Sequence, residues 1–138
     1  MTSGRRSSSS SGGGTRRLGT SPGFAVRRVY DPPLPDDGLR VLVDRLWPRG
    51  LSKDAARVDL WLRDIAPSDA LRQWYGHDPA RWDEFRRRYF VELEAHRERL
   101  EALRRRARRE RITLLFGARD KERNNAVALL SFLESLRR

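Results

Sequence analysis

The chain has 138 residues, a formal net charge of +11 and no cysteine. This length suits one domain with its own core, and the lack of cysteine excludes disulfides, thiolate metal sites and cysteine nucleophiles. No apolar run reaches the ~18 residues that a membrane span needs, and no apolar segment follows the basic N-terminus, which excludes a secretory signal. We therefore expect a cytoplasmic protein without a membrane partner.

The positive charge is shared between an N-terminal tail and the rest of the chain. Residues 1–23 hold four arginines and no acidic residue, which leaves a net charge of +7 for the remainder. This tail is rich in serine and glycine and has no hydrophobic periodicity, so it cannot bury enough apolar surface to offset its chain entropy. We predict a disordered tail at 1–23 and a single α/β domain at 24–138.

Two strands are predicted at the start of the domain. Short runs of β-branched, aromatic and aliphatic residues at 24–30 and 40–44 indicate them, and the second is expected to be covered by helices on both faces. The three-proline loop between them is too short for a crossover helix, so the first strand either pairs antiparallel with the next strand or lies at a sheet edge. Ser52 is a good N-cap for a helical turn at 51–56, and alternating residues at 58–62 indicate a further strand.

Helical periodicity dominates the second half of the chain. Ser68 is the expected N-cap of a helix that ends at Gly76. Asp78 is the expected N-cap of the next helix, with Pro79 as its first residue. From 82 to 107 apolar residues recur every three or four positions, which predicts an amphipathic helix of about 28 residues and about 42 Å. Such a length is large for this domain, so we expect a bend or a break. A strand at 111–116 and a helix at 124–136 complete an α/β fold with a small, mainly parallel sheet flanked by helices.

Two of the predicted strands run directly into charged loops, at 44–50 and 117–120. Ligands of open α/β sheets bind beyond the carboxyl ends of the strands, so these loops would form one site if their strands are parallel neighbours. Arginine forks suit phosphate or carboxylate, glycine lets backbone N–H groups approach an anion, and a helix N-terminus adds donors. We therefore predict a small anionic ligand, phosphorylated or nucleotide-like. The residues expected to bind it are Arg45, Trp47, Arg49, Gly50, Lys53, Arg119, Asn124 and Asn125.

Three titratable residues near these loops are candidates for catalysis in a hydrolase or transferase. Asp44 or Asp120 would act as a base or metal ligand, and His77 would carry protons. Each has a structural alternative, because Asp44 can pair with Arg45, Asp120 can cap the last helix, and His77 can form a local hydrogen bond. The two aspartates could share Mg²⁺, although the arginines around them disfavour it. The histidine spacing predicts no zinc site, and no cofactor is indicated.

A run of arginines at 104–111 and the four tryptophans suggest a second class of function. The run is most simply the solvated end of the long helix, where cations suit the negative helix terminus, and the tryptophans are better explained as core anchors. Together with the tail, the run could instead bind phosphate backbones. The alternative function is therefore a nucleic-acid-associated or regulatory binding module without catalysis. A scaffold that uses the long helix to contact a partner is a third hypothesis.

Four segments occur in order along the predicted domain: VLVDRLWPRGLSK, IAPSDALRQWYGHDP, WDEFRRRY, and ITLLFGARD followed by NNAVALL. This ordered set resembles the YeaO-like branch of the domain of unknown function 488, and the resemblance covers about residues 24–136. It implies a small bacterial α/β domain and no particular reaction. The positions that match the family's motifs are Asp44, Arg45, Trp47, Pro48, Arg49, Gly50, Lys53, Pro67, Ser68, Trp74, His77, Asp120 and Asn125.

Overall fold

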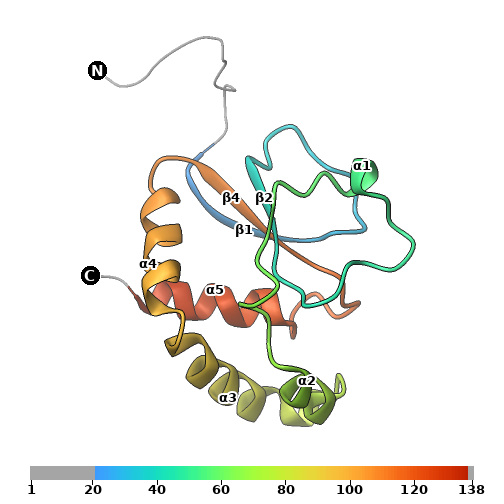
Figure 1. The fold of residues 1–138 in the computed structure, drawn as a ribbon, viewed down its shortest axis with the longest axis vertical. Coiled ribbons are helices and arrows are strands. Elements are labelled where there is room, and N and C mark those ends of the chain that lie inside the picture. The colour runs from blue at the N-terminus through green and yellow to red at the C-terminus, as the bar shows by residue number, and fades with distance from the viewer. Residues whose placement is uncertain (1–20, 137–138) are drawn as a thin grey trace.

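The computed structural model describes residues 21–136, and Figure 1 shows how their strands and helices are arranged. This arrangement confirms the predicted α/β class. The tail predicted at 1–23 lies outside the described residues except for its last three, of which Gly23 begins the first strand. The elements in chain order are β1 (Gly23–Arg28), β2 (Leu39–Leu42), α1 (Lys53–Ala56), β3 (Leu60–Trp61), α2 (Asp69–Tyr75), the 3₁₀ turn η1 (Pro79–Arg81), α3 (Trp82–Glu94), α4 (Arg97–Arg106), β4 (Arg111–Phe116) and α5 (Asn125–Ser135).

The strands of the described residues form one parallel sheet in the order β1-β4-β2-β3. The carboxyl ends of β2 and β4 therefore lie at the same edge, as the predicted site required. β1 lies at the side of the sheet, which confirms one of the two alternatives for this strand. The loop that leads back to β2 passes β4 so closely that a Cβ on Gly38 would lie 2.2 Å from the Arg111 carbonyl oxygen. Together with a φ of +67°, this approach requires glycine.

Alternate residues of the central strands face two hydrophobic clusters. Val41 and Leu114 belong to the larger cluster, which α2, α3, α4 and α5 cover, whereas Leu42 and Leu115 belong to the smaller one. Helices on both faces were expected, and helices are present on both, although the second face carries only the short helix α1. The connection between β2 and β3 contains one helix, α1, of only four residues. Side chains from its loops therefore cover most of the smaller cluster. The hydrophobic residues packed there are Trp47, Leu51, Val58 and Trp61.

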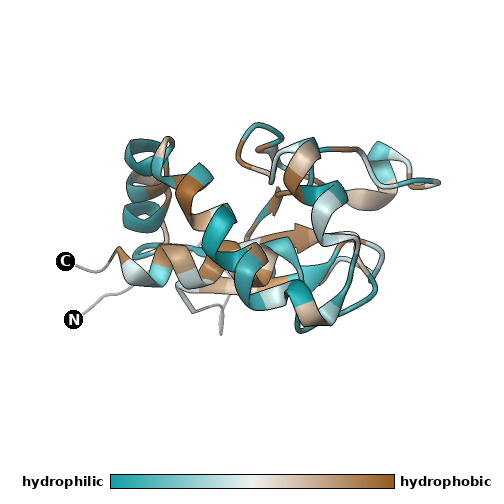
Figure 2. Cartoon of the chain, turned by 90° about the horizontal axis from the view of Figure 1, so that it is seen from below, coloured by the Kyte–Doolittle hydropathy of each residue, from teal (hydrophilic) through white to brown (hydrophobic). Residues whose placement is uncertain are grey.

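The predicted long helix is interrupted, as its length required. Asp78 caps η1 rather than an α-helix, and α3 and α4 are separated at Ala95 and His96. Figure 1 shows α4 turning sharply away from α3 at this break. Each of the two helices still buries apolar residues that recur every three or four positions. Hydrophobic and hydrophilic residues alternate along both helices in Figure 2. His96 is half-buried at the break itself. Within residues 21–136 no helix is long and apolar enough to cross a lipid bilayer.

A buried ion pair fixes the amino end of the sheet, opposite the predicted site. Arg40 and Asp37 are each 4% exposed, and Arg40 Nη1 donates to Asp37 Oδ2 at 2.6 Å. The remaining nitrogens of this guanidinium donate to the carbonyl oxygens of Arg57 and Ala56 at 3.0 and 2.7 Å. The Thr113 hydroxyl of β4 donates to the Asp37 carbonyl at 2.7 Å. These bonds satisfy the buried charges and tie β2, β4 and α1 together.

Candidate functional site

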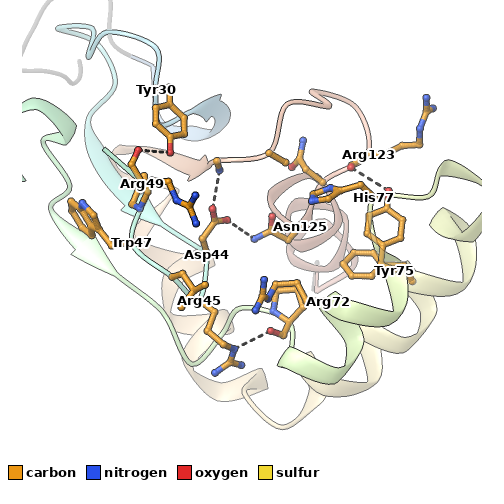
Figure 3. Close-up of a pocket in the computed structure, with 17 residues that line it drawn as sticks. Tyr30, Asp44, Arg45, Trp47, Arg49, Arg72, Tyr75, His77, Arg123 and Asn125 are labelled. Atoms are coloured by element: carbon orange, nitrogen blue, oxygen red, sulfur yellow. Dashed lines mark hydrogen bonds between the residues drawn. The ribbon is translucent and has the colours of Figure 1, made fainter. Parts of the chain in front are cut away.

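A cavity of about 450 Å³ opens at the sheet edge where β2 and β4 end. Its walls come from the chain after β1, the loop after β2, α2 with the turn that follows it, the loop after β4 and the start of α5 (Figure 3). This volume lies within the range of cavities that hold small molecules. The polar and aromatic side chains that line it are Tyr30, Asp44, Arg45, Trp47, Arg49, Arg72, Tyr75, His77, Phe85, Arg123, Asn124 and Asn125.

Asp44 lies at the centre of this site, shortly after the end of β2 (Figure 3). Its Oδ1 accepts a hydrogen bond from Asn125 Nδ2 at 3.0 Å, and its Oδ2 accepts one from the Gly117 N–H at 2.9 Å. Burial raises the pKa of the Asp44 carboxyl above its ordinary value, while these two bonds and the charge of Arg72 lower it by less. Asp44 therefore joins the loops after β2 and β4, and its environment favours the protonated form more than water does.

Asn125 is the first residue of α5, and its side-chain amide faces Asp44. Its Nδ2 donates to the Val43 carbonyl at 2.8 Å and to Asp44 Oδ1 at 3.0 Å, which uses both N–H groups. The reversed amide would place its oxygen against a carbonyl and a carboxylate, so this orientation is fixed. The amide oxygen accepts no hydrogen bond from residues 21–136. Asn125 thus links α5 to the end of β2 through its nitrogen and leaves its oxygen for another donor.

Four arginines line the cavity, and two of them direct their guanidinium groups into it (Figure 3). Arg49 forms no ion pair among residues 21–136. Arg72 lies on α2 and pairs with Asp69 at 2.9 Å through one nitrogen, in an exposed contact. Such exposed pairs contribute little and exchange easily. These two side chains are the cations most available to a ligand.

The other two arginines are engaged in the surrounding structure. Arg45 donates to the carbonyl oxygens of Pro67 and Ala66 at 3.1 and 3.2 Å, so it braces the chain that precedes α2. It does not form the pair with Asp44 that was the structural alternative. Arg123 Nε lies 3.3 Å from a carboxylate oxygen of Asp120, and its guanidinium points away from the cavity (Figure 3).

The start of α2 is fixed by a second contact, from α3. Glu92 accepts hydrogen bonds from the Ser68 N–H at 2.9 Å and from the Ser68 hydroxyl at 2.6 Å. The same hydroxyl accepts from the Leu71 N–H at 3.2 Å, as the predicted N-cap should. α2 is therefore held against α3 at its N-terminal end.

His77 and an aromatic pair form the wall on the α2 side. His77 has a φ of +58°, a left-handed conformation that is uncommon for residues other than glycine. Gly76 before it is also left-handed, because it ends α2 as the C-cap. The rings of Tyr75 and Phe85 stack with centroids 4.5 Å apart. A left-handed backbone at a residue other than glycine, as at His77, is strained, and such strain concentrates at binding and catalytic sites. The His77 side chain forms none of the local hydrogen bonds of its structural alternative within the described chain.

The structure brings together part of the predicted site. Seven of the predicted residues line the cavity: Asp44, Arg45, Trp47, Arg49, His77, Asn124 and Asn125. Four do not: Gly50, Lys53, Arg119 and Asp120. Lys53 begins α1, which covers the other face of the sheet. Asp120 accepts hydrogen bonds from the N–H groups of Glu122 and Arg123 at 2.9 and 3.0 Å, so it shapes a turn. The cap of α5 is Asn124 instead, through the Val127 N–H.

Trp47 has both a structural contact and a place in the cavity wall. Its Nε1 donates to the Leu51 carbonyl at 2.6 Å, and its ring meets Trp61 edge-on with centroids 5.4 Å apart. These contacts agree with the interpretation of the tryptophans as anchors.

Five of the polar and aromatic residues that line the cavity were not predicted: Tyr30, Arg72, Tyr75, Phe85 and Arg123. Arg72 and Tyr75 are three positions apart on α2 and precede His77, and this helical spacing was the available signal. Tyr30 and Arg123 carry no comparable signal, because tertiary contacts place them: the Tyr30 hydroxyl donates to the Arg49 carbonyl at 2.9 Å. No group of three potential metal ligands comes together anywhere in residues 21–136.

The sequence pattern of one protein family, described as "Inactive DUF488-N3 subclade", matches residues 23–137. The chain belongs to the DUF488 family. Relatives of this DUF488 chain include uncharacterized protein Rv3073c of Mycobacterium tuberculosis, which is 46% identical over 108 residues, 78% of this chain and 91% of the relative. Uncharacterized protein YeaO of Escherichia coli is 39% identical over 110 residues, 80% of this chain and 96% of YeaO. These matches confirm the predicted resemblance to the YeaO-like branch. No solved structure matches the chain.

Proposed function

We propose that this DUF488 protein is a cytoplasmic binding module for a small anionic ligand, phosphorylated or nucleotide-like, held in the cavity beyond β2 and β4. The observation that carries the proposal is the charge of the lining, which includes four arginines and one carboxylate. Arg49 directs its guanidinium into the cavity and has no ion pair within the described residues. An arginine fork binds phosphate through two parallel hydrogen bonds, and a concave cationic wall concentrates anions.

We further propose that the ligand is bound without chemical turnover. The matching family is described as inactive. Of the three predicted acid–base residues, Asp44 and His77 line the cavity, whereas Asp120 lies outside the lining and accepts hydrogen bonds from backbone N–H groups. Hydrolysis or group transfer needs a base within reach of the substrate and a positioned nucleophile, and this lining offers a binding surface more readily than such a set.

Isothermal titration of the full chain with inorganic phosphate and with ribose 5-phosphate tests the binding. We expect saturable binding that weakens at least about tenfold in Arg49→Ala and in Arg72→Ala, since each variant removes a charge-assisted contact. Both side chains are exposed, so the thermal midpoint should stay within a few degrees of wild type.

Arg105→Ala is the matched control, because Arg105 is an exposed arginine of α4 outside the cavity lining. Equal losses in all three variants would show that only net charge matters and would contradict a specific site. A large loss of stability in Arg49→Ala would assign Arg49 to the fold. Product formation from the bound ester, followed by ³¹P NMR, would contradict binding without turnover.

Contact with nucleic acid is a second candidate function, favoured by one contact at the opposite end of the sheet. The Gly23 N–H donates to the Glu110 carbonyl at 3.2 Å. β1 therefore begins beside the exposed arginines after α4, Arg108 and Arg109, and the sequence before β1 is also basic. A fluorescence titration with DNA and RNA at two salt concentrations tests this candidate. Binding that persists near physiological salt supports it, and binding that disappears there contradicts it.

A further inference from the structure

Two polar groups of the cavity lining, Asp44 and Asn125, offer hydrogen-bond acceptors. Each oxygen of Asp44 accepts one hydrogen bond from the protein, whereas a carboxylate has about four acceptor positions. Asn125 presents its amide oxygen, because both N–H groups of its amide are used by Val43 and Asp44. Acceptors in a partly closed site favour a ligand that brings its own donors, since unmade bonds there are costly.

The available cations lie around this acceptor pair. Arg49 and Arg72 direct their guanidinium groups into the cavity from different elements, and His77 lies on the α2 side (Figure 3). Arg72 is close enough to Asp44 for its charge to act on that carboxyl. The site therefore has two parts: a cationic part that suits an anion, and an acceptor part at Asp44 and Asn125 that suits a donor.

We infer that the ligand is a phosphate ester that carries free hydroxyl groups close to its phosphate, such as a sugar or polyol phosphate. This inference rests on the proposed anion binding and adds the class of ligand. The hydroxyls donate to Asp44 and to the Asn125 amide oxygen, while Arg49 and Arg72 hold the phosphate. A neutral hydroxyl fits better than an ammonium donor, because an ammonium group would meet the guanidinium groups of Arg49 and Arg72, which point into the same cavity.

Titrations of the full chain with three phosphate esters of similar size test whether the site prefers hydroxyl donors, no donor or an ammonium donor. The esters are glycerol 3-phosphate, propyl phosphate and phosphoethanolamine. They present hydroxyls, no donor, and an ammonium group, respectively. We expect glycerol 3-phosphate to bind about tenfold more tightly than propyl phosphate, the effect of two added hydrogen bonds of ordinary strength. Phosphoethanolamine should bind no better than propyl phosphate. Equal affinity for all three esters, or a preference for phosphoethanolamine, would overturn the inference.

The Asp44→Asn variant tests whether Asp44 causes the preference for glycerol 3-phosphate over propyl phosphate. It should lose most of the advantage of glycerol 3-phosphate and keep its affinity for propyl phosphate. If this variant does not fold, the side-chain NH₂ resonances of Asn125 in the wild-type protein give an independent measurement. They should shift with glycerol 3-phosphate and not with propyl phosphate, and identical shifts with both would contradict the assignment.

The two proposals fail in different ways. Binding of all three esters with equal affinity, weakened in Arg49→Ala, would leave the anion site standing and remove only the hydroxyl preference. Absence of saturable binding by every ester would remove both.

Discussion

Replacing Asn125 by Asp is expected to destabilise the fold strongly at neutral pH and less so in acid. The substitution removes two donated hydrogen bonds, to Val43 and Asp44, at about 1 kcal/mol each. It also places a second carboxylate about where the amide nitrogen lies, 3.0 Å from an Asp44 oxygen. Two full charges at that distance would repel by roughly 5 kcal/mol at an effective dielectric constant of about 20.

One of the two carboxyls therefore retains a proton, which limits the total loss to about 3–5 kcal/mol near pH 7. The folded variant then binds more protons than the unfolded chain above about pH 4, so its free energy of unfolding rises as the pH falls. Urea unfolding followed by tryptophan fluorescence at pH 4.5 and pH 7 measures both effects. A domain of this size has a stability of roughly 5–15 kcal/mol, so losses of this magnitude are measurable.

Asn125→Ala is the control for this prediction, because it removes the same two donors without adding a charge. Its loss should be about 2 kcal/mol and should grow less between pH 4.5 and pH 7 than the loss in the Asp variant, because it removes only the donor that lowers the pKa of Asp44. Equal losses in the Asp and Ala variants at both pH values would refute the reasoning, since they would show that no ionised carboxyl of Asp44 faces position 125.

Three further predictions concern the contacts that hold the sheet and the site. Arg40→Met should cost about 2–3 kcal/mol in urea unfolding, because the buried Asp37 carboxylate loses its shorter ion pair and keeps only Arg27, at 3.3 Å; an unchanged midpoint would contradict a charged pair. Glu92→Ala should cost about 1–2 kcal/mol, because the cap residue of α2 loses two bonds; Glu94→Ala, at an exposed ion pair, should stay within about 0.5 kcal/mol. Burial raises the pKa of Asp44, so ionisation of this group removes stability as the pH rises above its ordinary value. The unfolding free energy of wild type minus that of Asp44→Asn should therefore fall between pH 4 and pH 7, and a constant difference would count against this.

The elements that sequence predicts well are those that local physics determines. Ser52 and Ser68 cap the helical turns predicted from them, and Gly76 ends α2 in the left-handed conformation. The pairing partner of β1 was not predicted, because β4 supplies it from the far end of the chain. The residues that pack on the second face of the sheet could also not be predicted from local sequence patterns. They are largely loop residues such as Trp47 and Leu51, whose apolar character predicts burial but does not predict which residues they contact.

The candidate site was predictable where it depends on strand ends. The rule that ligands lie beyond the carboxyl ends of parallel strands places Asp44 and Asn125 correctly at one edge. It includes Lys53 wrongly in the cavity wall, because proximity in sequence does not show that α1 turns to the opposite face. It misses Arg72 and Tyr75, because they reach the cavity on a helix from the connection between β3 and β4. Their placement depends on packing of α2 against α3, which no local pattern contains.

The position of β4 has a consequence for the order of folding during synthesis. β4 is the last strand in the chain, yet it lies between β1 and β2 and is the partner that joins them. A nascent chain that ends before residue 111 can pair β2 with β3, but its β1 has no strand beside it. Closing such long loops slows folding and leaves strand edges exposed meanwhile. The cavity is completed later still, when Asn125 reaches Asp44, so a ligand of this site would bind and stabilise only chains whose C-terminal helix has already been made.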